Sequence, residues 1–209
     1  MAGLVVANAT LFVDLSTIFS GSGPVAGADV HDFSTTNNVD APAFDAVGKS
    51  SLGDLDITDD GNMLFVVNLY DRRIYAIPID NPAGTRRFAA PEPSPLDCPA
   101  TDARPFALKA RDGLVYAGVT CTGETSATND PAKLGLFVYA FDPKAIPAGA
   151  GDVTAPNYTE VLRFSGAGTN SMAYRHAGKT WNVWTNDFNV AAAPCTTSCT
   201  NPAIYPMPW

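Results

Sequence analysis

The sequence is poor in charged residues and in stretches typical of helices. Asp, Glu, Lys and Arg make up 16% of its 209 residues, whereas Gly and Pro occur 17 times each. No segment rich in Leu, Ala, Glu and Lys keeps helical spacing over several turns, which argues against long surface helices. Because turn residues are this frequent and 46% of the residues are apolar, we expect an all-β fold with many turns.

Long apolar runs and excess positive charge are missing as well. No run approaches the roughly 18 apolar residues that a membrane-spanning helix needs. The segment from Met1 to Val13 lacks the basic start of a signal peptide. The formal net charge is −8, whereas a nucleic-acid-binding protein needs a basic surface. We therefore expect no membrane span and no nucleic-acid partner.

Residues that could form a catalytic centre are also scarce. The two histidines are His31, flanked by Asp29 and Asp32, and His176, in a turn. No Gly-x-Ser-x-Gly motif occurs, and no Gly-rich loop lies between a strand and a helix. Residues 56–62 resemble a calcium loop, but Val67 stands where a bidentate carboxylate is needed, so a hairpin turn is the better interpretation. The sequence predicts no catalytic residues, no metal site and no cofactor.

Four cysteines are present: Cys98, Cys121, Cys195 and Cys199. Cys98 precedes one expected strand and Cys121 ends its neighbour, so their sulfur atoms can meet. Cys195 and Cys199 lie in a Pro/Ala/Thr loop that a local bond would close. Zinc is the alternative, but Cys-x3-Cys without a second close pair matches structural zinc sites poorly. We predict disulfides within each pair, and with them an extracellular or cell-surface location.

A degenerate repeat organises the chain. Each copy has an apolar strand, an Asp-Gly or similar turn, a second apolar strand and a third strand ending in Asp. Fuller copies span Gly53–Asp80 and Pro105–Asp142, and partial copies span Gly3–Asp14 and Ala173–Thr185. Their spacing of roughly 50 to 65 residues suits four-stranded propeller blades with insertions.

This repeat predicts a single β-propeller fragment over 1–209, with about three to four four-stranded antiparallel blades and incomplete at both ends. The partial units fall at approximately 1–15, 50–82, 104–143 and 158–187, and 188–209 would be a disulfide-containing loop and the start of a missing blade. Long Gly/Pro-rich loops, among them 20–50, 81–103 and 143–156, would connect the blades. An exported parent protein that supplies the remaining blades would also reconcile the disulfides with the missing signal peptide.

The residues Leu64-Phe-Val-Val-Asn68, followed by Ile74-Tyr-Ala-Ile77, resemble the Tyr-Val-Thr-Asn (YVTN) type of bacterial β-propeller repeat. The wider segment from Gly53 to Asp80 is similar to the propeller region of large exported cell-surface proteins of the serine-aspartate-repeat adhesin kind. The resemblance covers about half of the chain. It implies a propeller and export, but no activity, because propellers include both enzymes and binding modules.

Two groups of polar residues are candidate binding residues. Asp54 and Asp56 project to the same face of the innermost strand, where they could line a central channel or cap the backbone of the neighbouring blade. Asn68, Asp71 and Arg72 form a polar cluster in a strand connection, where contact surfaces are commonly found.

These observations favour a noncatalytic binding or scaffolding module of an exported bacterial surface protein. Its partner would be a protein or a cell-surface glycan. Two alternatives stay open: a fragment of a lactonase-like or quinoprotein-like propeller enzyme, and a structural spacer in a surface assembly.

Overall fold

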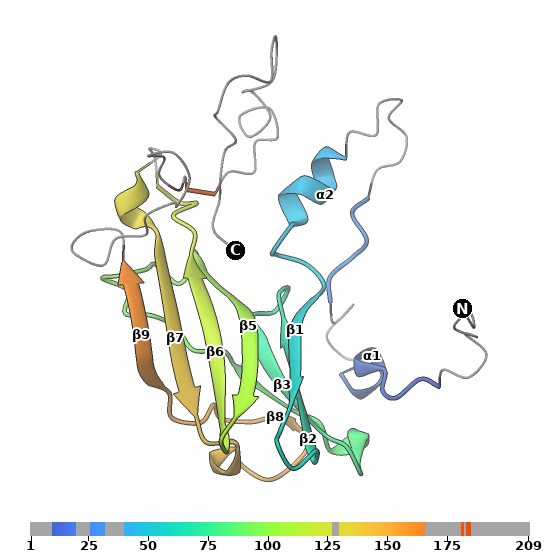
Figure 1. Ribbon diagram of the computed structural model, residues 1–209. Helices are drawn as coiled ribbons and strands as arrows, with labels where there is room; N and C mark the ends of the chain where they lie inside the picture. Colours follow the sequence, from blue (N-terminus) through green and yellow to red (C-terminus); the bar gives the residue numbers. More distant parts are fainter. Residues whose placement is uncertain are drawn as a thin grey trace, which may run out of the picture.

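Two β-sheets pack face to face in the part of the chain that the structure describes (Figure 1). The computed structural model describes residues 10–19, 26–31, 40–126, 130–165, 181 and 183–184. Within these residues the structure is mostly β, as the composition predicts. Two short helices, α1 (Leu15–Ile18) and α2 (Ala41–Ala46), precede the sheets. No helix in this part of the chain is long and apolar enough to cross a membrane.

The first sheet contains five strands in the order β1-β2-β3-β4-β8. The first four follow one another in the chain and pair antiparallel, while β8 adds to β4 in parallel. Their bounds are β1 Leu52–Ile57, β2 Met63–Asn68, β3 Arg73–Pro78, β4 Arg86–Ala89 and β8 Gly151–Asp152. A single 3-10 turn, η2 (Pro82–Gly84), leads into β4.

The second sheet contains four antiparallel strands in the order β5-β6-β7-β9. Their bounds are β5 Ala103–Arg111, β6 Leu114–Cys121, β7 Gly135–Phe141 and β9 Thr159–Ser165. The 3-10 turns η3 (Pro131–Lys133) and η4 (Pro143–Ala145) flank β7. Between β7 and β9 the chain leaves this sheet to form β8 on the first sheet.

The main hydrophobic core lies between the two sheets and is centred on Phe141. Its ring meets Phe65 and Phe88 of the first sheet edge to face, with centroids 5.8 and 5.9 Å apart. All three side chains are at most 2% exposed. Edge-to-face aromatic pairs add to the stabilisation from burial itself, so these contacts fix how the sheets pack.

The outer face of the first sheet is partly covered by the segment around α1. Leu15 and Phe19 pack there with Val66, Tyr75 and Ile77. Asp14 caps α1 by accepting a hydrogen bond from the Ser16 amide.

The hairpin turns follow the sequence signals. Asp112 and Gly113 both have positive φ, 52° and 77°, as a two-residue hairpin loop with a type I′ turn requires. The equivalent β1–β2 turn is longer, and within it Gly61 takes a φ of 72°. Turn lengths therefore differ between the two sheets.

The structure departs from the sequence expectations at three connections. Residues 81–103, expected as a loop, contain β4, and residues 143–156 contain β8. Residues 159–165, expected to open a separate unit at 158–187, instead pair with β7 as the fourth strand of the second sheet. The strands β4 and β8, with four and two residues, carry too little alternation to stand out among glycines and prolines.

The predicted Cys98–Cys121 disulfide is present, with the Cα atoms 5.7 Å apart. It ties the loop before β5 to the end of β6. The second predicted pair, Cys195 with Cys199, lies outside the described residues.

Candidate functional site

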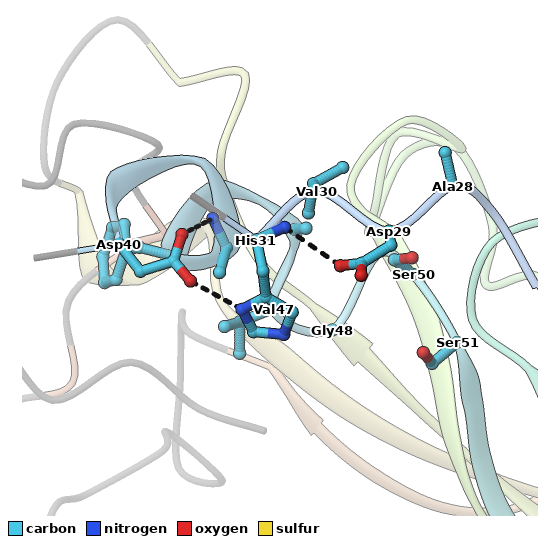
Figure 2. Close-up of a pocket in the computed structure, with 12 residues that line it drawn as sticks. Ala28, Asp29, Val30, His31, Asp40, Val47, Gly48, Ser50 and Ser51 are labelled. Atoms are coloured by element: carbon cyan, nitrogen blue, oxygen red, sulfur yellow. Dashed lines mark hydrogen bonds and ion pairs between the residues drawn. The ribbon is translucent and has the colours of Figure 1, made fainter. Parts of the chain in front are cut away.

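A pocket of about 370 Å³ opens beside the loop that leads into β1 (Figure 2). Its walls come from residues 28–31 on one side and from α2 with residues 46–51 on the other. Figure 2 shows the polar side chains of Asp29, His31, Asp40, Ser50 and Ser51 around this space.

A histidine–aspartate pair forms one wall of the pocket. His31 Nδ1 lies 2.5 Å from Asp40 Oδ2, and the other oxygen of Asp40 accepts a hydrogen bond from the Ala43 amide. Asp40 therefore caps α2 and orients the imidazole at once. Asp29 accepts a hydrogen bond from the His31 backbone N–H at 3.1 Å, which holds the backbone of residues 29–31 in place.

The charge state of this pair follows from its geometry. The hydrogen bond to Asp40 raises the pKa of His31, with smaller electrostatic contributions from Asp40 and Asp29. The pair therefore holds its proton up to a higher pH than a free histidine would, although partial burial of the ring opposes this shift. The His31 side chain lines the pocket and is about half exposed. Among the described residues that line the pocket, none is a lysine or an arginine.

The remaining walls combine hydroxyl groups with apolar side chains. Ser51 has a φ of 71°, and its amide donates a hydrogen bond to Ala26 O at 2.7 Å. Ser51 O in turn accepts from the Leu69 amide, which anchors this wall to the first sheet. Phe44 and Val47 supply an apolar wall. Carboxylate, imidazole and hydroxyl groups beside an apolar surface suit a small neutral ligand rich in hydroxyl groups.

Two of the predicted binding residues, Asn68 and Asp71, belong to a different, structural network. Asn68 is fully buried, and its amide donates to the Tyr75 hydroxyl, which donates to Asp71 at 2.6 Å. Burial raises the pKa of Asp71, although hydrogen bonds from Tyr75 and the Arg73 amide oppose this. Arg87 reaches the same hydroxyl, lies over the Phe19 ring at 4.4 Å from its centroid and binds β8.

Arg72 is not among the residues that line the pocket, and its side chain contacts the loop before β5. It has a φ of 56° and donates through Nη1 to Ala100 O at 2.6 Å. Burial lowers its pKa, as does the neighbouring charge of Arg104. Arg104 and Lys49 both bind Glu124; burial alone would raise the pKa of that carboxyl, and the two cations hold it below its ordinary value.

The other predicted residues, Asp54 and Asp56, bridge the facing edges of β1 and β5. Asp54 accepts hydrogen bonds from its neighbour Leu55 N and from Leu108 N of β5, both at 2.9 Å. Asp56 does the same with the amides of residues 57 and 110, also at 2.9 Å. The carboxylates thus satisfy donors on two strand edges, as the capping alternative from the sequence describes.

The structure therefore brings together a site that the sequence pattern alone does not indicate. His31 pairs with Asp40, nine residues further along the chain, and its sequence neighbour Asp32 lies outside the described residues. The available signal was Asp40 followed by Ala41 and Pro42, the start of a capped helix. Among the described residues, no three His, Cys, Asp or Glu side chains are grouped to hold a metal ion.

The geometry is the basis for any functional assignment. Searches against protein-family models, curated proteins and solved structures find no match to this chain.

Proposed function

We propose that this chain is a noncatalytic binding or scaffolding module of an exported bacterial surface protein. Its two sheets would be consecutive blades of a β-propeller, and the pocket around His31 and Asp40 would bind a surface glycan.

The blade assignment is supported by the strand order and by the contact between the sheets. In the first sheet β8 adds to the outer edge in parallel. The first four strands of the first sheet and the four strands of the second run outward in chain order, antiparallel, from β1 and β5. Those two strands face each other, and the Asp54 and Asp56 carboxylates join their edges. Radially arranged four-stranded sheets whose innermost strands adjoin are the architecture of propeller blades.

The binding role is carried by one observation: carboxylate, imidazole and hydroxyl groups gather around one pocket beside the apolar side chains of Phe44 and Val47. Lys49, in the same loop, binds Glu124, which Arg104 also binds. The Cys98–Cys121 disulfide supports export, because such bonds persist in oxidising compartments.

A glycan array probed with the full chain tests this proposal. We expect binding to a subset of neutral glycans that is lost in Asp29→Ala, because a ligand hydroxyl loses its acceptor. Asp80→Ala is the matched control: Asp80 is an exposed carboxylate outside the pocket lining. Binding that is absent, or equal in the wild type and Asp29→Ala, would refute a glycan site at this pocket.

A further inference from the structure

Two apolar sheet faces remain exposed, one on each side of the two-sheet stack. On the first sheet the exposed residues are Leu52, Leu55 and Ile57; on the second they are Leu114, Leu162 and Phe164. Strand pairing places each set on one face. In the first sheet, Leu55 is paired with Val66, which lies on the face that the α1 segment partly covers. In the second sheet, Leu162 is paired with Val138 and Phe164 with Leu136. Exposed apolar faces of this kind mark association surfaces.

When the two sheets are aligned strand by strand, the outer face of the first sheet matches the face that the second sheet buries in the core. The alignment uses the register shift that both β1 and β5 carry: the first row of paired residues after the shift is equivalent in the two sheets. These equivalent rows are Leu55, Val66 and Tyr75 in the first sheet and Leu108, Ala117 and Tyr139 in the second. Leu108 is 4% exposed because the first sheet packs against its row, whereas Leu55 is 59% exposed.

The opposite faces show the same correspondence. The row that the first sheet turns toward the second is Asp56, Phe65 and Ala76, and its equivalent on the outer face of the second sheet is Lys109, Tyr116 and Ala140. Both rows have an aromatic ring followed by alanine. Beside β1, where Leu55 is exposed, the outer face of the first sheet thus presents part of the surface that the second sheet buries internally, while Val66 and Tyr75 of the same row are covered by the α1 segment. The outer face of the second sheet presents the equivalent of the surface that the first sheet turns inward.

We propose that copies of this chain stack head to tail. The outer face of the second sheet of one copy packs on the outer face of the first sheet of the next copy. The contact is heterologous, so it builds a closed ring or an open stack. It extends the proposed scaffolding role and does not require the glycan pocket. Its centre is the apolar groove of about 710 Å³ beside β1, lined in part by Leu52, Leu55 and Leu64.

This contact is weaker than the internal interface. The positions equivalent to Asp54 and Asp56 are Ala107 and Lys109, so no carboxylate there bridges the two strand edges. Residues around α1 also cover the β3 side of the first sheet, which confines the contact to the side of β1. The association is therefore reversible and depends on concentration.

Complementing variants test the head-to-tail arrangement. Leu55→Glu disables one face and Leu162→Glu the other, and each variant is expected to weaken self-association by about 10- to 100-fold, the range for losing one buried leucine. Mixed together, the two variants still share one intact pair of faces and should form a 1:1 dimer that grows no further. Leu96→Glu, in a loop and 99% exposed, should assemble like the wild type.

Sedimentation velocity over micromolar to millimolar concentrations measures these outcomes, with circular dichroism to verify folding; Ile57→Lys replaces Leu55→Glu if the latter unfolds. A wild type that stays monomeric throughout, a Leu55→Glu variant that assembles normally, or a mixture without a dimer would each overturn the proposal. Glycan binding is scored separately on monomeric Leu55→Glu, so failure of assembly is distinguished from failure of the binding role.

Discussion

Removing the Asp54 carboxylate should destabilise the junction between the sheets. In Asp54→Ala, the Leu108 amide loses its acceptor at the free edge of β5. Leu108 is 4% exposed, so solvent replaces that acceptor poorly. The Leu55 amide loses a partner too, but Leu55 is largely exposed and water can take over.

The magnitude follows from these two environments. A hydrogen bond to a charged group contributes about 1.5–3 kcal/mol, and an unsatisfied buried donor costs about 1–3 kcal/mol. We expect Asp54→Ala to lower the free energy of unfolding by about 2–3 kcal/mol. Asp54→Asn keeps an acceptor but loses the charge, so it should cost about half as much. A typical domain has a stability of about 5–15 kcal/mol, so either loss is measurable.

Urea unfolding followed by tryptophan fluorescence measures the change, with Asp80→Ala as the control for removing an exposed carboxylate. Asp56→Ala should lower the free energy of unfolding as Asp54→Ala does, and it should also change how that free energy depends on pH in the acid range. The hydrogen bond with Lys109 lowers the pKa of Asp56, so its contribution is present above the unfolded pKa and is lost as pH falls through the folded pKa. An Asp54→Ala variant within about 0.5 kcal/mol of the wild type, the usual range for surface substitutions, would refute the bridging argument.

Two further predictions concern the disulfide and the pocket. Replacing Cys98 and Cys121 with alanine opens a loop with a sequence separation of 23, which should cost about 3 kcal/mol and lower Tm by about 6–12 °C in a thermal scan; an unchanged Tm would contradict a stabilising disulfide. Asp40→Asn keeps a good helix cap but removes the anion beside His31, so the pKa of His31 should fall toward its ordinary value in an NMR titration. Because that pKa is raised in the fold, the contribution of the pair to stability is present below the unfolded pKa and is lost as pH rises through the folded pKa; an unshifted His31 titration in Asp40→Asn would argue against the pair.

Much of the sheet framework could be predicted from local patterns. Apolar alternation located β2, β3, β6 and β7, and Asp112-Gly113 marked a hairpin turn. Cys98 lies before the start of β5 and Cys121 at the end of the neighbouring β6, and these positions were enough to predict the pair. These signals depend on short-range geometry, so they survive without knowledge of the tertiary contacts.

Other features depend on contacts between distant segments. If the two repeats are aligned on their turn glycines, Gly61 and Gly113, Phe65 matches Ala117. The strand pairing instead makes Val66 the counterpart of Ala117, because the two turns differ in length. A one-residue shift moves each side chain to the opposite face. Likewise, Asn68 and Asp71 look like exposed polar turn residues, and only the network with Arg87 of β4 shows that they are structural.

The excursion of the chain to β8 makes the two sheets mechanically inseparable. Between β7 and β9 the backbone crosses to the first sheet and then returns. On the first sheet, Arg87 donates a bidentate pair of hydrogen bonds to the Asp152 carboxylate. A cut between β4 and β5 would leave the first sheet without β8, and a cut after β8 would leave the second without β9. Unfolding should therefore proceed as one cooperative transition, with no stage at which a single sheet survives.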